Sequence, residues 1–189
     1  ALLTNTTGSN NTGIGWKADV GSNNLTNATA IGADAVVNAS NKIRLGNTAI
    51  TSIEGQVAFS SASDERLKKA IENTRYGLDT ILKLRPVEYQ MKSNDLQQIG
   101  FIAQELQPLV PEAVTGTEGD LEKGETLGIT YTTLIPVLTK AIQEQQILIE
   151  EQRASIQVQT GLIEQLISDV ERLKQTLPYD WIVISYLIY

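Results

Sequence analysis

The chain has 189 residues, a formal net charge of −7 and a pI of about 4.7. Hydrophobic residues make up 41% of it and aromatic residues only 5%, which disfavours a large aromatic core and favours a thin, repetitive or oligomeric architecture. Binding to a phosphate backbone needs clustered Lys and Arg side chains, and a chain with a net negative charge is not expected to have such a surface. We therefore expect no nucleic-acid partner. Cysteine and histidine are both absent, which excludes disulfides, thiol catalysis and histidine-based triads or metal sites.

The chemistry that remains open is narrow. Proton transfer has to use Asp, Glu, Lys, Tyr or a terminal amine, and we expect neither a cofactor nor a metal. The chain starts at Ala1 without an initiator methionine or a signal-peptide pattern, so we expect it to be part of a longer protein.

Residues 1–47 contain a degenerate repeat in which an isoleucine or leucine is followed by glycine. Its three units are Asn10–Gly15, Asn27–Gly32 and Asn41–Gly46. Glycine and asparagine tolerate positive φ at tight corners, so the repeat predicts β-solenoid coils whose Ile and Leu side chains stack inward. One coil cannot bury its apolar face alone, so we predict that residues 1–62 form the trimeric, β-roll-like end of an upstream fibre or tail protein. The units are similar to repeats in the heads of trimeric autotransporter adhesins and in many phage tail proteins, and a disordered Asn/Thr linker is the alternative.

Residues 48–62 alternate loosely between apolar and polar side chains and predict one or two strands. The apolar positions are Ile50, Ile53, Val57 and Phe59. The pattern becomes helical at Ser63, which is a favourable N-cap residue. The acidic Asp64 and Glu65 suit the positive end of a helix dipole, and Leu67 and Ile71 lie four residues apart. We therefore predict a helix that starts at Ser63.

Residues 63–133 predict a small α+β region. Its apolar blocks are short, and prolines interrupt them. The expected elements are an apolar block over 76–84 that ends at Arg85-Pro86, a strand over 87–91, a strand running into a helix over 99–106, a turn-rich acidic loop over 116–124 and a short strand over 127–131.

Residues 134–177 show the clearest pattern, a heptad repeat without a break. β-Branched residues occupy most positions of one core register, and glutamine occupies three successive positions of the other. The repeat predicts a parallel coiled coil about 60 Å long, and its polar layers indicate a fixed register and oligomer number. We favour a homotrimer; a dimer and a long helix packed on its own domain are the alternatives. The expected trimer core is Ile142, Gln145, Ile149, Gln152, Ile156, Gln159, Ile163, Leu166, Val170 and Leu173.

Residues 178–189 form an apolar tail. Its strongly apolar part, Trp181–Tyr189, is nine residues long, whereas a membrane-spanning helix needs about 20. We therefore expect a packed tail and no membrane partner.

The boundary at Ser63 also carries a candidate nucleophile and base. Lys68 lies five residues after Ser63, within reach of a four-carbon side chain, and a neighbouring chain is another source of lysine. The Ser63 Oγ can attack the carbonyl of Ala62 while a neutral lysine takes its proton. A free lysine costs roughly 4.6 kcal/mol to deprotonate at pH 7, so burial in an assembled interface would have to gate the reaction. Asp64 is the competing base or an orienter of the lysine, and an ordinary helix cap is the alternative role of the serine.

Five segments of the chain carry a family resemblance. They are Ser63–Lys68, Leu84–Tyr89, Ile99–Leu106, Val110–Val114 and Tyr131–Leu138. Together they resemble the C-terminal intramolecular chaperone domain of phage endosialidases, tail spikes and tail fibres. Related domains occur in bacterial surface proteins and in a self-cleaving animal transcription factor. The resemblance covers about residues 63–150, and the motifs are jointly highly specific.

The resemblance implies an autocatalytic serine endopeptidase that acts once on its own chain. It implies a homotrimer in which residues 63–189 fold the upstream β-structure and then cut at Ala62–Ser63. The serine–lysine dyad of some family members maps onto Ser63 and Lys68, with Asp64 as a further catalytic candidate. The expected location is a phage virion tail or a bacterial cell surface, after assembly in the host cytoplasm. The alternatives are a non-cleaving structural trimerisation module of a fibre or adhesin and, more weakly, a receptor-binding tip.

Overall fold

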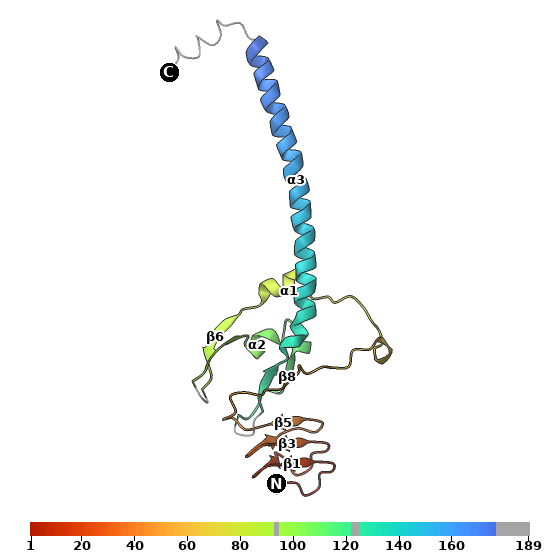
Figure 1. Cartoon of the computed structure of the whole chain (residues 1–189), viewed down its shortest axis with the longest axis vertical. Helices are drawn as coiled ribbons and strands as arrows, with labels where there is room; N and C mark the ends of the chain where they lie inside the picture. Colours follow the sequence, from red (N-terminus) through yellow and green to blue (C-terminus); the bar gives the residue numbers. More distant parts are fainter. Residues whose placement is uncertain (93–94, 122–124, 177–189) are drawn as a thin grey trace.

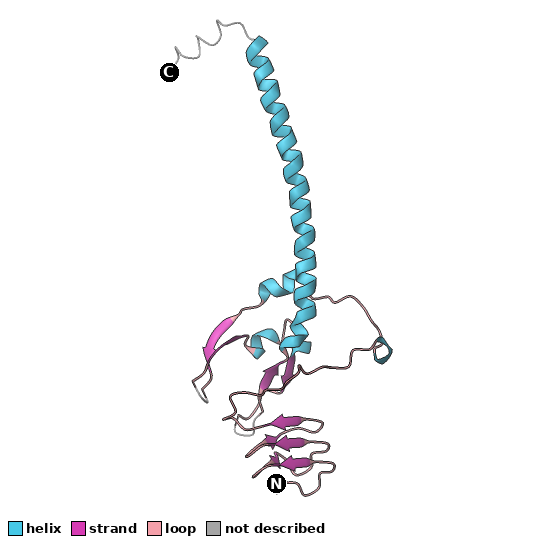
Figure 2. Cartoon of the chain, viewed as in Figure 1, coloured by secondary structure: helices cyan, strands magenta, loops and turns pink. Residues whose placement is uncertain are grey.

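The chain extends along one long axis, with three parts in sequence order (Figure 1). The computed structural model describes residues 1–92, 95–121 and 125–176. A stack of short strands lies at the N-terminal end, a small body of helices and strands follows, and a single helix extends from that body (Figure 2). The mixed fold class with a long C-terminal helix is confirmed, and the apolar tail over 178–189 lies outside the described residues.

The N-terminal stack consists of two sheets of short parallel strands. In one sheet β1 pairs with β3 and β3 with β5, and in the other β2 pairs with β4. The strands are β1 (Thr12–Ile14), β2 (Asp19–Val20), β3 (Thr29–Ile31), β4 (Val36–Val37) and β5 (Ile43–Leu45). The predicted corner residues adopt positive φ before and after the strands of the first sheet, at Asn10, Asn27, Asn41, Gly15, Gly32 and Gly46. The β-roll-like stalk and its trimer stay predictions.

The interior of the stack is made of alanine and valine. Side chains alternate along a strand, so Ala30 points inward while Thr29 and Ile31 point to the other side. The prediction that Ile and Leu of the repeat stack inward is therefore wrong, because the narrow space between the two sheets is filled by smaller side chains. Ile14, Ile31 and Leu45 instead form an exposed row in register across three strands, which we call the apolar column. The buried residues are Ala18, Val20, Ala28, Ala30, Ala35 and Val37.

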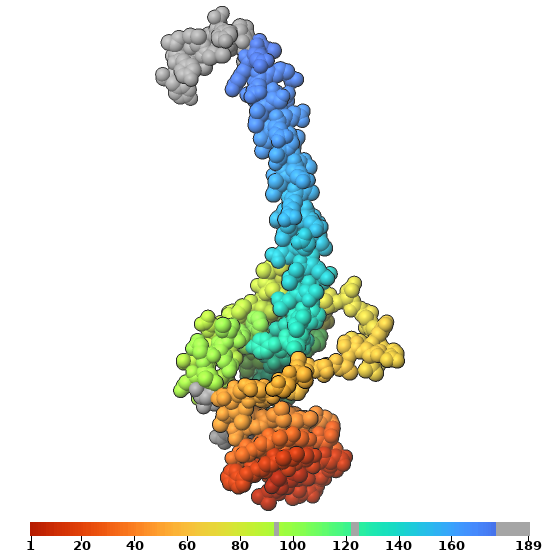
Figure 3. Space-filling view, in the orientation of Figure 1, coloured from red at the N-terminus to blue at the C-terminus, as the bar shows by residue number. Residues whose placement is uncertain are grey.

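Residues 48–75, which we call the arm, connect the stack to the body (Figure 3). Every residue of the arm is exposed. The strands predicted over 48–62 do not form. A lone extended segment has no neighbouring strand to pair with its backbone N–H and C=O groups. The apolar alternation alone is therefore not sufficient to form a strand.

The helix predicted from Ser63 is also wrong. The region holds one 3₁₀ turn, η1 (Glu65–Leu67), and its cap is Asp64, not Ser63. Leu67 and Ile71, the expected apolar face, are both exposed. Without packing of that face, a short segment does not recover the cost of helix nucleation.

The α+β body contains two antiparallel strand pairs, β6 with β7 and β8 with β9. The strand predicted over 87–91 and the strand-to-helix segment over 99–106 are confirmed, whereas β8 was not predicted. The elements are α1 (Leu78–Lys83), β6 (Val87–Gln90), β7 (Gln97–Gly100), α2 (Ala103–Leu106), η2 (Pro111–Ala113), β8 (Val114–Gly116), β9 (Leu127–Ile129) and η3 (Tyr131–Thr133). Their buried core consists of Leu106, Val110, Ala113 and Leu134.

The last element, α3 (Leu134–Thr176), is a single helix of 43 residues. Its foot is buried at Leu134, Val137 and Ala141, and α1 packs against it (Figure 1). Beyond the foot, most of the apolar heptad stripe is exposed in the single chain. The long helix is thus confirmed, and its parallel trimer stays a prediction. Within the described residues, no helix is long and apolar enough to cross a membrane.

Candidate functional site

Ser63 and Lys68 meet through the 3₁₀ turn η1. The turn closes with the Lys68 N–H donating to the Glu65 carbonyl at 2.9 Å, and Lys68 itself is extended, with φ −113° and ψ 153°. This reversal directs the lysine side chain back toward Ser63, where Nζ donates to Oγ at 2.7 Å. The two predicted residues are therefore brought together, by a tighter turn than the expected α-helix.

Asp64 is held by Arg66. Its carboxylate accepts from the Arg66 backbone N–H at 2.9 Å and from the guanidinium at 3.0 and 2.6 Å. The side-chain hydrogen bond from Arg66, together with the backbone one, lowers the pKa of Asp64 below its usual range. A carboxylate with a lowered pKa is a weaker base, and here it caps the turn. Arg66 was not singled out from the sequence, although the Asp-x-Arg spacing is the signal for such a pair.

The Ser63–Lys68 pair is open to solvent in the single chain, as are Ala62 and the rest of the arm. The arrangement supplies a hydroxyl nucleophile and an amine in hydrogen-bond contact. Acyl transfer also benefits from oxyanion donors in a site that excludes water. In the single chain the pair is exposed and does not lie in such a site. Within the described part of the chain, no group of three His, Cys, Asp or Glu side chains could hold a metal ion.

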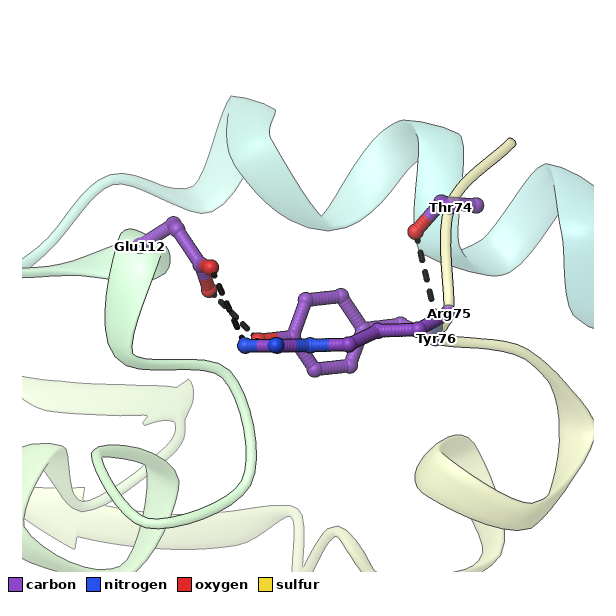
Figure 4. Close-up of polar contacts among 4 residues, drawn as sticks. All are labelled: Thr74, Arg75, Tyr76 and Glu112. Atoms are coloured by element: carbon purple, nitrogen blue, oxygen red, sulfur yellow. Dashed lines mark hydrogen bonds and ion pairs between the residues drawn. The ribbon is translucent and has the colours of Figure 1, made fainter. Parts of the chain in front are cut away.

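The downstream end of the arm is fastened to the body by a polar cluster (Figure 4). The Tyr76 hydroxyl donates to Glu112 Oε2 at 2.7 Å, and Arg75 Nη2 donates to the Tyr76 hydroxyl at 2.6 Å. Arg75 also lies over the Tyr76 ring, 4.8 Å from its centroid, and 3.4 Å from Glu112 Oε1. The hydrogen bond from Tyr76, with smaller contributions from the Glu112 backbone and Arg75, lowers the pKa of Glu112. Thr74 Oγ1 accepts from the Tyr76 N–H at 3.2 Å.

A second fastening ties α1 to the foot of α3. The Leu78 N–H, at the start of α1, donates to Glu144 Oε2 at 2.7 Å. Gly77 is buried beneath this carboxylate, and a Cβ at this position would collide with it. Neither Glu144 nor Glu112 was expected from the sequence, because both act across long sequence separations.

Two further motif residues also form structural contacts. Glu105 pairs with Arg85, which lowers the pKa of the carboxyl, the hydrogen bond being the main cause. Phe101 stacks on Tyr131 with ring centroids 6.2 Å apart, and its N–H donates to the Tyr131 hydroxyl at 3.2 Å. These contacts hold the body together and lie outside the Ser63 turn.

A serine–lysine turn ahead of an α+β body, which continues into a long, uncovered helix, provides a candidate acyl-transfer site. The model of the family described as Chaperone of endosialidase, Peptidase_S74, matches residues 63–115. This match begins at Ser63 and confirms the family resemblance over that segment. It supports an intramolecular chaperone role. No curated protein shows a significant match to the chain.

Proposed function

We propose that this chain is a C-terminal intramolecular chaperone that trimerises, folds the β-structured region upstream of it and then cuts itself between Ala62 and Ser63. The observation that carries the proposal is the 2.7 Å contact between Lys68 Nζ and Ser63 Oγ at the first residue of the family match. The substrate is the chain itself, and the reaction needs no cofactor. The proposed setting is a phage tail or a bacterial surface, after assembly in the host cytoplasm.

The proposed chemistry has two steps. Neutral Lys68 takes the hydroxyl proton as Ser63 Oγ attacks the carbonyl carbon of Ala62, and the C–N bond breaks as that proton passes to the Ser63 amine. This leaves an ester between Ala62 and Ser63 Oγ, which water hydrolyses to an Ala62 carboxylate and a free serine hydroxyl. Asp64 keeps the turn closed through Arg66. Burial lowers the pKa of a lysine toward neutral pH. The proposal therefore requires that assembly buries the turn.

Oligomerisation is supported by the surface that the single chain leaves uncovered. Its accessible surface is 15399 Å², whereas a compact monomer of 20.6 kDa exposes about 8,900 Å². The uncovered apolar residues include the heptad stripe of α3 and the apolar column of the stack. Both run along the long axis, as a parallel homotrimer requires.

A non-cleaving trimerisation module is the second candidate. The observation in its favour is that Ser63 and Lys68 are exposed in the single chain, which does not provide the buried environment that a lysine base needs. Under this alternative, the chain ends a fibre and Ser63 is only part of a surface turn.

Intact mass and light scattering on freshly purified protein separate the two. Under the proposal, wild-type protein yields fragments 1–62 and 63–189, and Ser63→Ala yields an uncut trimer. Ser61→Ala is the matched control, because it removes a neighbouring hydroxyl and should cut normally. Uncut 20.6 kDa chains in all three proteins would contradict self-cleavage and leave the structural module.

A further inference from the structure

The arm carries its own uncovered apolar surface, separate from the apolar column and the heptad stripe. Val57 is 83% exposed and Phe59 is 90% exposed, and Ile50 and Ile53 are exposed as well. Across residues 50–62 the only charged side chain is Glu54. β-Branched and aromatic residues with almost no charge are typical of a buried strand, and they are unusual over a whole solvated segment.

The chain's own body does not cover this surface. Upstream, Asn47 Nδ2 donates to the Ala33 carbonyl at 2.9 Å, which fixes the arm to the stack. Downstream, Tyr76 is fixed to Glu112. Between these anchors, in the described part of the chain, the hydrogen bonds of residues 51–73 have both partners inside the arm. Figure 1 shows the part of the arm around η1 bowing outward from the axis that joins the stack and α3, and Figure 3 shows the segment before it running across the molecule between the stack and the body.

A second copy of the chain is the occupant that these features favour. The heptad stripe would align copies in parallel along α3, and the Leu78 N–H, three residues after the arm ends, is held by Glu144 of that same helix. The arm therefore joins the two parts of the chain that carry the other uncovered apolar surfaces, the stack and α3. The low charge of residues 50–62 also suits the uncovered apolar surface of an identical chain better than the acidic solvent-facing surface of this protein.

We propose that residues 50–59 of each arm dock in extended form on a second copy of the chain, and that this docking fixes the Ala62–Ser63 bond three residues downstream. The proposal rests on the proposed homotrimer. It explains why the strand pattern of 48–62 has no strand in the single chain: its hydrogen-bonding and apolar partners belong to the neighbour. Under this proposal, the segment ahead of the serine–lysine turn is held between two chains. The cleavage site at Ser63 is therefore fully formed only in the assembly.

Photo-crosslinking tests the proposal on the full chain in the Ser63→Ala background. Phe59 is replaced by the aromatic photo-crosslinker p-benzoylphenylalanine in a copy with one affinity tag, and it is co-expressed with an unmodified copy that carries another tag. A matched sample carries the crosslinker at Leu173, in the expected trimer core. The expected result is a crosslinked product that bears both tags at each position.

The outcomes distinguish this inference from the proposed function. Products with both tags from position 173, but only intrachain or no products from position 59, would overturn the docking of the arm and leave the trimer intact. A monomer by light scattering, without two-tag products at either position, would overturn both. In the chain with Ser63 present, Val57→Ser with Phe59→Ser should slow release of fragment 1–62 by about ten-fold or more while the trimer persists. Thr48→Ser, in the arm but outside the docking segment, should not slow it, and unchanged release in the double variant would overturn the coupling to cleavage.

Discussion

The carboxylate of Glu144, near the foot of α3, accepts a hydrogen bond from the backbone N–H of Leu78 at 2.7 Å. Lys140 lies 3.6 Å from the other carboxylate oxygen and helps to hold it in place. This contact joins the segment that follows the arm to the helix that carries the heptad stripe. The downstream end of the arm is therefore tied to α3 through this contact.

Glu144→Ala should lower the free energy of unfolding by about 1 kcal/mol, because it removes the acceptor for the first N–H of α1. Urea unfolding of the Ser63→Ala protein measures the change, with Glu151→Ala on the exposed part of α3 as the control. Gly77→Ala should cost less in the Glu144→Ala background than alone, because the added Cβ collides with the carboxylate. Equal costs in both backgrounds would show that the two residues do not act together.

Lys68→Arg should abolish cutting and leave assembly unchanged, because a guanidinium does not act as a base near neutral pH. Intact mass after purification gives the uncut fraction, and light scattering gives the oligomer. Lys69→Arg is the neighbouring control and should cut as wild type does. Complete cleavage by the Lys68 variant would remove lysine from the mechanism.

Asp64→Asn should slow cutting without abolishing it. Asparagine still caps a turn, but it loses the charged contacts to Arg66 that close η1. Asp64→Ala should be slower still. The rate at which the fragment 63–189 appears ranks the three proteins, and a complete loss in Asp64→Asn with a normal oligomer would make Asp64 the base.

Ile156→Asp should dissociate the oligomer, because it places a charge in the expected trimer core. Val158→Asp is a closely matched control: in the single chain the two side chains are exposed to 58% and 64%, but Val158 is outside the core register. Sedimentation equilibrium should give a monomer for the first variant and a trimer for the second. Equal behaviour would mean that the heptad register is assigned incorrectly.

The Tyr76–Glu112 contact should weaken in acid. The folded state lowers the pKa of Glu112, so its stabilisation is fully present above the ordinary glutamate pKa of about 4.3 and is lost as the pH falls through the lower folded value. The stability difference between wild type and Tyr76→Phe should therefore shrink below about pH 4.3. Tyr89→Phe is the control, because the Tyr89 hydroxyl bonds to the neutral Gln98 and its effect should not follow this titration. A Tyr76→Phe difference that is constant from pH 7 to pH 3 would argue against the contact.

Local patterns predicted much of this fold. The corner residues of the repeat are identifiable because positive φ restricts the residue choice, as at Asn27 and Gly32. The long helix α3 follows from its unbroken period, and β6 from the strand pattern that follows Arg85-Pro86. In each case the deciding interactions lie within a few residues along the chain.

The errors concern interactions between distant residues or between chains. A period of two shows that Ala30 and Ile31 face opposite sides, but it does not say which side is the interior. The strand pattern of 48–62 lacks a partner in the single chain, so no strand forms. The contact between Ser63 and Lys68 was expected from their spacing, whereas Glu112 and Glu144 lie 36 and 66 residues from their partners and left no local signal.

The small interior of the N-terminal stack has a consequence for how such proteins change length. Alanine and valine fill the interior of each repeat unit, and asparagine and glycine occupy the corners of every unit. Asn27 Nδ2, for example, donates to Asn41 Oδ1 at 3.0 Å in the following coil. A whole coil inserted or deleted in register would leave neither a cavity nor an unmatched neighbour. We therefore expect that single repeat units can be duplicated or lost without a change in the C-terminal body.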